Sequence, residues 1–131
     1  QVFCIALISI DDFAQMEAQR GAAFGDALLQ AFAREALGAI RLSDLLARWS
    51  GSEFLLMLSD TRSSLARMGL DRLSERVQLL KTDFNEPAQP LRHSVGLAEH
   101  HAGATVADTI ARAAQALHAG QQCAEQRLVL A

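Results

Sequence analysis

The chain has 131 residues, half of them apolar, and a formal net charge of −3 at pH 7. This length fits one domain with a sizeable core. No apolar run approaches the roughly 18 residues needed to cross a bilayer. The sequence has no polybasic patch, so binding to nucleic acid is not expected. The two cysteines, Cys4 and Cys123, form no C-x-x-C pair, so they are interpreted as buried or unreactive thiols in a reducing compartment.

The first third of the chain predicts one strand and one helix. The run VFCIALISI, residues 2–10, is continuously apolar and rich in β-branched residues, which is typical of a strand covered on both faces. Residues 22–40 repeat apolar side chains at helical spacing and predict a helix with one buried face. The residues expected on that face are Phe24, Leu28, Ala31, Phe32, Ala36 and Leu37.

The middle of the chain predicts a β-hairpin followed by a second helix. The segments LLARW, residues 45–49, and EFLLML, residues 53–58, are short apolar runs joined by Ser-Gly-Ser, whose glycine tolerates positive φ. A helix is expected over residues 62–81, before two prolines interrupt the chain in DFNEPAQP. The residues expected to point inward from this helix are Leu65, Met68, Leu73, Val77 and Leu80.

The last third of the chain predicts a strand, a helix and a closing strand. The strand is HSVGLAE, residues 93–99, and the helix spans residues 105–120 with Thr105 as its N-cap. The final segment RLVLA closes the pattern as a strand. Strands that alternate with helices around one central hairpin predict an α/β sandwich, with a sheet of about five strands flanked by helices. This pattern leaves the spatial order of the strands open.

Several short motifs follow one another along the chain in a characteristic order and at characteristic intervals. This combination is more specific than any single motif. ISIDDF, residues 8–13, is similar to L-D-x-D-x-F, and GAAFGD, residues 21–26, is similar to G-H-x-x-G-D. SGSEF, residues 50–54, lies at the tip of the hairpin, HSVGLAE is similar to S-I-G-V-A, and the segment ARAAQALHAGQQCAEQRLVL ends the chain. Together these motifs resemble the GGDEF family of bacterial diguanylate cyclases, which make cyclic di-GMP from two GTP.

The resemblance implies a GGDEF-type sandwich, similar to the palm of nucleotidyl cyclases, with a signature β-hairpin. Residues 1–131 are then expected to form a single degenerate GGDEF domain. The family's opening helix would precede Gln1, so the chain is interpreted as a piece excised from a multidomain protein. A cytoplasmic location in a bacterium is expected, and a membrane anchor elsewhere in the protein stays open.

The resemblance also identifies the positions of the family's metal ligands. Two acids hold Mg²⁺ in the family, and their positions are occupied by Ser9 and Ser52 in this chain. A neutral hydroxyl does not supply the charge of a carboxylate. Asp11 is expected on the same strand face as Ser9 but about 6 to 7 Å along the strand, and Asp12 on the opposite face. No metal cofactor is therefore expected, and the hairpin is interpreted as degenerate at Ser50, Gly51, Ser52, Glu53 and Phe54.

The family's nucleotide contacts are replaced as well. A family lysine aligns with Ala14, and the asparagine that reads guanine aligns with Glu17. The phosphate-binding lysine and arginine align with Gln121 and Glu125, whereas the acid Asp26 is retained. A carboxylate that faces a triphosphate repels it. These replacements predict that the domain is not an active diguanylate cyclase.

A different set of residues matches the family's inhibitory site, where the product cyclic di-GMP binds. Arg41 and Asp44 form an R-x-x-D motif at the expected interval before the hairpin. An arginine fork bonds guanine O6 and N7 or a phosphodiester, and an aspartate accepts from guanine N1 and N2. A second arginine from the following helix is implied, which is Arg72, with Arg76 one turn later as the alternative. The alternative for Arg41 and Asp44 is a solvated ion pair of little energetic value.

These observations predict a catalytically inactive GGDEF domain that acts as a cyclic di-GMP receptor through Arg41, Asp44 and Arg72. Expected partners are cyclic di-GMP and neighbouring domains of the same protein, of EAL or sensory type, with a homodimer left open. No contact of this domain with nucleic acid or a membrane is expected. One alternative is a structural or dimerisation pseudoenzyme that binds no nucleotide. Another is a regulatory domain of a fused EAL phosphodiesterase, which would sense GTP through Asp26 and Glu53.

Overall fold

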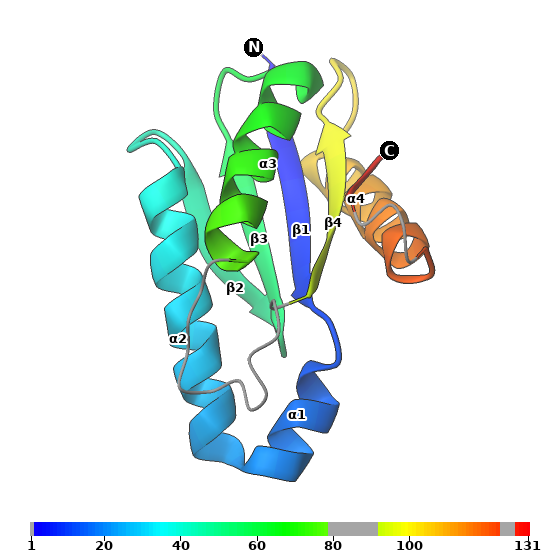
Figure 1. Cartoon of the computed structure of the whole chain (residues 1–131). Coiled ribbons are helices and arrows are strands. Elements are labelled where there is room, and N and C mark those ends of the chain that lie inside the picture. The colour runs from blue at the N-terminus through cyan, green and yellow to red at the C-terminus, as the bar shows by residue number, and fades with distance from the viewer. Residues whose placement is uncertain (1, 79–91, 124–127) are drawn as a thin grey trace.

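The computed structural model describes residues 2–78, 92–123 and 128–131 (Figure 1). The predicted inward residue Leu80, the two prolines and Glu125 lie outside these described residues. In chain order the elements are β1 (Cys4–Ile10), α1 (Phe13–Arg20), α2 (Ala22–Ala39), β2 (Leu45–Ser50), β3 (Glu53–Leu58), α3 (Ser63–Gln78), β4 (His93–Glu99), α4 (Val106–Gln121) and β5 (Leu128–Leu130). None of the helices in the described part of the chain has the length and apolarity of a membrane span.

The strands form one mixed sheet in the order β2-β3-β1-β4-β5. The central strand β1 pairs antiparallel with both β3 and β4, while β2 runs antiparallel to β3 and β5 runs parallel to β4. Every residue of β1 is buried, because helices cover both faces of the sheet at its centre. The predicted five-stranded α/β sandwich is therefore confirmed.

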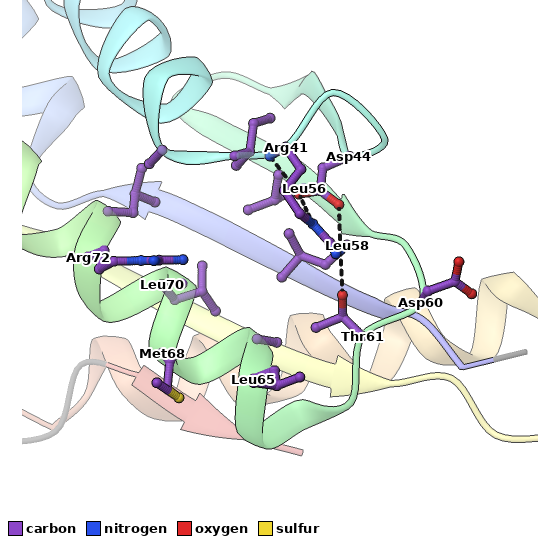
Figure 2. A pocket seen from close by; sticks show the side chains of 15 residues that line it. Arg41, Asp44, Leu56, Leu58, Asp60, Thr61, Leu65, Met68, Leu70 and Arg72 are labelled. Carbon is purple, nitrogen blue, oxygen red and sulfur yellow. Dashed lines mark hydrogen bonds and ion pairs between the residues drawn. The ribbon is translucent and has the colours of Figure 1, made fainter.

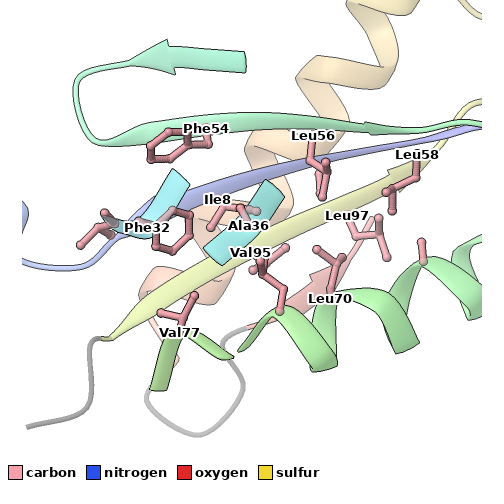
Figure 3. Packing of buried hydrophobic residues seen from close by; sticks show 14 of the residues in the cluster. Ile8, Phe32, Ala36, Phe54, Leu56, Leu58, Leu70, Val77, Val95 and Leu97 are labelled. Atoms are coloured by element: carbon pink, nitrogen blue, oxygen red, sulfur yellow. The ribbon is translucent and has the colours of Figure 1, made fainter. Parts of the chain in front are cut away.

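The helices α2 and α3 cover one face of the sheet (Figure 1). Their buried side chains meet the inward residues of β1, β3 and β4 in the larger hydrophobic core (Figure 3). The rings of Phe32 and Phe54 stack there with centroids 5.1 Å apart, which fixes α2 against the hairpin. Removal of this apolar surface from water is the main favourable contribution to folding. The packing of α2 and α3 on the sheet also determines where the loops at either end of these helices lie.

The helix α4 covers the opposite face, against β1 and β4. Gly96 allows this close approach, because a Cβ at its position would lie 2.0 Å from the carbonyl oxygen of Ala113. The predicted N-cap is confirmed: the Thr105 hydroxyl accepts from the backbone N–H of Asp108 at 3.0 Å. The other end of α4, at Gln121, reaches the end of β1.

The structure corrects several expectations about the helices. Leu37, Leu65 and Met68 were expected to point inward, but their side chains are 57%, 61% and 63% exposed. Tertiary packing selects a narrower stripe of each helix than apolar spacing alone suggests. On α3 the buried stripe consists of Ala66, Leu70, Leu73 and Val77. The short helix α1 was not predicted, and it buries only Phe13.

Candidate ligand-binding site

One candidate region lies where β1 ends beside the hairpin. Ser9 pairs in register with Glu53, and the backbone N–H of Ile10 donates to the carbonyl oxygen of Ser52 at 3.2 Å. These contacts border a cavity of about 560 Å³, here named the hairpin hollow. It is lined by Ser9, Ile10, Asp11, Asp12, Phe13, Ala14, Gln15, Ser52 and Gln121. The structure thus brings together Ser9, Ser52 and Gln121, as the motif positions predicted.

The two aspartates after β1 depart from the predicted strand geometry. β1 ends at Ile10, and Asp12 adopts a left-handed conformation with φ 58° before α1 begins. The expectation that Asp12 lies on the strand face opposite to Ser9 is wrong, because the strand ends at Ile10 and both residues line the hairpin hollow. The Asp11 carboxylate accepts from the hydroxyl of Ser94 at 2.9 Å. In the described part of the chain, no group of three or more His, Cys, Asp or Glu side chains is arranged to hold a metal ion.

The turn of the hairpin is held by a residue that the sequence analysis did not select. Gly51 has a positive φ of 49°, which agrees with its predicted role in the turn. The Arg48 guanidinium reaches over the turn, where its Nε donates to the Gly51 carbonyl oxygen at 2.8 Å. The pairing of β2 and β3 shifts register between Arg48 and Ser50, so the tip carries a bulge.

A second candidate region lies at the opposite end of the hairpin, between the α2–β2 loop and α3. It is a cavity of about 360 Å³, here named the α3 pocket (Figure 2). Arg41, Asp44 and Arg72 all line it, so the three residues that were predicted to bind ligand lie around one cavity. The other lining residues are Ala39, Ile40, Leu56, Leu58, Asp60, Thr61, Leu65, Ala66, Met68, Gly69, Leu70 and Leu73. The floor of the pocket is therefore apolar, and its charged groups lie at the edge.

The Asp44 carboxylate is the buried anchor of the R-x-x-D motif. Its side chain is only 2% exposed. One oxygen, Oδ2, accepts from the backbone N–H and the Nε of Arg41 at 2.9 and 3.4 Å. The other, Oδ1, accepts from Arg41 Nη2 at 3.2 Å and from the backbone N–H of Ser59 at 3.1 Å. A carboxylate has about four acceptor positions, so all those of Asp44 are engaged within the protein.

The Arg41 guanidinium is held between Asp44 and the segment that follows β3. Its Nη2 donates to the carbonyl oxygen of Ser59 at 2.5 Å and to the hydroxyl of Thr61 at 2.7 Å. The Arg41 side chain nevertheless stays 58% exposed. The pair with Asp44 is therefore part of a network that joins two loops, which differs from the simple solvated ion pair considered as an alternative.

A buried thiol lies directly behind this network. Cys4 Sγ donates to the carbonyl oxygen of Thr61 at 3.2 Å. Burial, with a smaller contribution from the negative charge of Glu99, raises the pKa of the Cys4 thiol to about 11. The expectation of a buried thiol is confirmed for Cys4, which stays protonated at neutral pH.

The two arginines of α3 lie in different environments. Arg76 pairs with Glu35 of α2 at 3.3 Å and donates to the carbonyl oxygen of Gly38 at 3.0 Å. Arg72 lines the α3 pocket and makes no hydrogen bond or ion pair with any other residue that the structure describes. The geometry therefore associates Arg72, and not Arg76, with Arg41.

The retained acid Asp26 lies in a third cavity, of about 370 Å³, between α2 and the hairpin. Arg48 and Phe54 line the same cavity, and the Arg48 guanidinium lies 5.9 Å from the centre of the Phe54 ring. Glu17 of α1 faces α2, because a Cβ on Gly25 would lie 2.8 Å from its carboxylate oxygen. Glu17 and Asp26, the two positions that the resemblance assigns to guanine recognition, are thus both acids and lie on neighbouring helices.

The five-stranded sheet with its central hairpin is the fold of GGDEF-type domains. The family described as "Diguanylate cyclase, GGDEF domain" matches residues 1–127. The chain therefore belongs to the GGDEF family. Diguanylate cyclase A of Treponema denticola is 28% identical over 131 residues, which cover 99% of this chain and 35% of that protein. The chain thus spans about a third of the length of this relative.

Solved structures of the family share the fold. The diguanylate cyclase SiaD from Pseudomonas aeruginosa, determined in complex with its activator SiaC, matches with a TM-score of 0.90 and 32% identity, covering 100% of this chain and 50% of that chain. The GGDEF domain of DgcB from Caulobacter crescentus, in complex with c-di-GMP, matches with a TM-score of 0.87 and 21% identity over 98% of this chain and 77% of that chain. The second likeness is one of fold alone.

Proposed function

We propose that this domain is a catalytically inactive member of the GGDEF family that binds cyclic di-GMP in the α3 pocket through Arg41, Asp44 and Arg72. The observation that carries the proposal is that Arg41 and Arg72, from separate elements, line one cavity with an apolar floor. An apolar floor suits a purine base, and guanidinium groups suit phosphodiesters or the O6 and N7 edge of guanine.

The donors needed for an anionic ligand are present at the edge of the pocket. Arg72 has no partner among the described residues. In Arg41, the Nε and Nη2 atoms make the contacts with Asp44, Ser59 and Thr61. The Nη1 atom of Arg41 makes no hydrogen bond within the described residues. Cyclic di-GMP carries two negative phosphodiesters. Two arginines are therefore matched in number to its two charges.

Asp44 supports the proposal in a specific way. Because its oxygens are engaged by Arg41 and Ser59, Asp44 first serves to hold Arg41 at the edge of the pocket. A direct hydrogen bond from guanine N1 or N2 to Asp44 requires that Arg41 release one of these acceptor positions. In the proposed complex, Arg41 exchanges this contact for one with the ligand.

The composition of the hairpin hollow supports the absence of cyclase activity. Ser9 and Ser52 place neutral hydroxyls where the family places the acids that hold magnesium. Asp11, which also lines the hollow, already accepts from Ser94. Gln121 supplies no positive charge for a triphosphate. The residues present therefore do not fit a magnesium-bound GTP.

Isothermal titration calorimetry with cyclic di-GMP tests the proposal. Saturable binding that is weakened at least about tenfold in Arg41→Ala and in Arg72→Ala is expected, since each removes a charge-assisted contact. Arg67→Ala, on the exposed side of α3, is the matched control and should bind as the parent does. No heat at tens of micromolar ligand, or unchanged affinity in Arg41→Ala, would remove the proposal. Incubation with GTP and Mg²⁺ or Mn²⁺ should yield no cyclic di-GMP.

The cavity beside Asp26 supports a second candidate function, GTP sensing. Asp26 can accept from guanine, and Arg48 and Phe54 supply a cation and an aromatic ring in the same cavity. In this case the domain would regulate a fused phosphodiesterase of the EAL type. Heat released on titration with GTP, and lost in Asp26→Ala, would favour it. Silent titrations with both nucleotides would favour a structural or dimerisation module.

A further inference from the structure

The turn after β3 supports the Arg41 guanidinium in addition to Asp44. Arg41 Nη2 donates to the Thr61 hydroxyl oxygen at 2.7 Å, a contact that Figure 2 marks with a dashed line, and to the Ser59 carbonyl oxygen at 2.5 Å. The Thr61 hydroxyl itself donates to the same Ser59 carbonyl oxygen at 2.6 Å. Because its one hydrogen is used in this way, the Thr61 hydroxyl serves as an acceptor for Arg41.

The chain at the start of β1 fixes the position of Thr61. The backbone N–H of Thr61 donates to the carbonyl oxygen of Val2 at 3.1 Å, and the carbonyl oxygen of Thr61 accepts from the Cys4 thiol at 3.2 Å. Thr61 is only 7% exposed. Neither of these backbone contacts involves Arg41 or Asp44. The Thr61 hydroxyl is therefore held in place independently of the ion pair that it supports.

The Nη2 nitrogen of Arg41 has more acceptors than hydrogens. A guanidinium Nη carries two hydrogens, but the Thr61 hydroxyl, the Ser59 carbonyl oxygen and Asp44 Oδ1 all lie within hydrogen-bond distance of it. The contact with Asp44 Oδ1 is the longest of the three, at 3.2 Å. Arg41 can release this contact at the smallest cost, because the turn keeps both hydrogens of Nη2 engaged. The oxygen that is released is an acceptor for guanine N1 or N2.

We propose that Thr61 is a positioning residue for ligand recognition in the α3 pocket. Its hydroxyl holds the Arg41 guanidinium, so that Asp44 can transfer its Oδ1 acceptor from Arg41 to a guanine N–H. This inference rests on the proposed binding of cyclic di-GMP, and it adds a residue outside the R-x-x-D motif to the recognition of guanine. Without the hydroxyl, Nη2 has two acceptors for its two hydrogens. The ligand must then displace a hydrogen bond that Arg41 cannot replace within the turn.

Calorimetric titration of Thr61→Val with cyclic di-GMP tests this inference. Valine keeps the branched shape of threonine and removes the hydroxyl, so the affinity should fall at least about fivefold. Thr61→Ser keeps the hydroxyl and should bind within about twofold of the parent. The matched control is Thr105→Val, which removes the N-cap hydroxyl of α4 and lies outside the residues that line the α3 pocket. It should lower the midpoint of urea unfolding and leave the affinity unchanged.

The preference for guanine over adenine separates positioning from a purely structural role. Adenine lacks the N1 and N2 hydrogens that Asp44 Oδ1 would accept. The preference of the parent for cyclic di-GMP over cyclic di-AMP should therefore fall by a similar factor in Thr61→Val and persist in Thr61→Ser. A parent that releases no heat with cyclic di-GMP overturns the proposed function and this inference together.

Three results would overturn the role of Thr61 alone, in a parent that binds cyclic di-GMP. One is an unchanged affinity, or an unchanged preference for guanine, in Thr61→Val. Another is an equal loss of affinity in Thr61→Val and Thr61→Ser. The last is a comparable loss in Thr105→Val, which would assign the effect to stability. Urea unfolding of each variant shows that it is folded under the conditions of the titration.

Discussion

The hairpin hollow and the α3 pocket lie at opposite ends of the same β2–β3 hairpin, and they differ in how their charges are held. In the hairpin hollow, Ser9 and Ser52 are neutral, and the Asp11 carboxylate accepts from Ser94. In the α3 pocket, a buried carboxylate holds one arginine at the edge, and a second arginine lies across the cavity. The first region thus has hydroxyls and acids around its cavity, whereas the second has two arginines at the edge of an apolar cavity.

This difference shows that the shape and the chemistry of a site have separate causes. The shape of the hollow follows from the backbone pairing of β1 with β3 and from the core below it, which single surface residues do not determine. The charge of the hollow depends on a few side chains. The side chains that line the hollow can therefore differ between proteins of this fold while the backbone, and the pocket at the other end of the hairpin, stay the same.

The largest expected effect concerns the buried anchor of the α3 pocket. Asp44→Ala should lower the free energy of unfolding by about 2 to 3 kcal/mol, because it removes the acceptor for the backbone N–H groups of Arg41 and Ser59 and for a guanidinium. Ser52→Ala, at the hairpin hollow, should change it by less than about 0.5 kcal/mol. Urea denaturation measures both. Equal losses in the two variants would contradict the difference drawn between the two regions.

An effect of similar size, confined to high pH, is expected from the thiol behind the α3 pocket. Because the folded-state pKa of Cys4 lies near 11, above the unfolded value of 9.0, its contribution to stability is complete below pH 9. It is lost as the pH rises through about 11, by roughly 2 to 3 kcal/mol in all. The chain has no tyrosine, so few other groups titrate in this window.

Thermal unfolding between pH 8 and about 11 provides the measurement for this titration. Cys4→Ala is the control, since it removes the titrating group and shifts the stability by an amount that does not depend on pH. The parent should lose stability more steeply than Cys4→Ala in this range. Parallel curves for the two proteins would show that the thiol does not carry the effect.

Much of the fold could be predicted because apolar runs and chain breaks mark most of its elements. The strand β4 has the predicted bounds, His93–Glu99, and β3 also agrees, at Glu53–Leu58. The helix α1 escaped prediction because its apolar periodicity is weak and it buries a single residue. The outward position of Leu65 and Met68 was missed because apolar spacing does not reveal that α3 lacks a cover on one side.

The candidate site was predictable in its residue types but not in its hydrogen bonds. The motif spacing placed Arg41, Asp44 and Arg72 together, and they line one cavity. The contacts of Arg41 with Ser59 and Thr61 depend on how the chain turns after β3. No sequence pattern encodes this turn, in which Asp60 adopts a positive φ. Sequence likewise could not show that Arg72 lines the cavity while Arg76 pairs with Glu35, because this depends on how α3 packs against α2.

A third prediction changes the charge of the hairpin hollow directly. The double substitution Ser9→Asp and Ser52→Asp should destabilise the metal-free domain by about 1 to 2 kcal/mol, since both new acids line the same cavity and the one at position 9 also pairs opposite Glu53. Millimolar Mg²⁺ or Mn²⁺ should recover much of this loss by supplying the missing positive charge.

Thermal unfolding with and without the metal measures the recovery, and the parent domain is the control, with no metal-dependent shift expected. If the double variant also shows no shift, the backbone of the hollow differs from that of a metal-binding relative. The argument that only side-chain charge was lost at this end of the hairpin would then fail.

The smallest expected change separates the two arginines of α3. Arg76→Ala should cost about 0.5 kcal/mol of stability, because its ion pair with Glu35 is partly exposed, and it should leave the affinity for cyclic di-GMP unchanged. Arg72→Ala should leave the stability nearly unchanged, since Arg72 has no partner among the described residues. It should lower the affinity for cyclic di-GMP. Urea denaturation and calorimetry on the same two samples give both readings. A loss of ligand affinity in Arg76→Ala alone would transfer the ligand contact to Arg76, and it would require α3 to release Glu35 and Gly38 on binding.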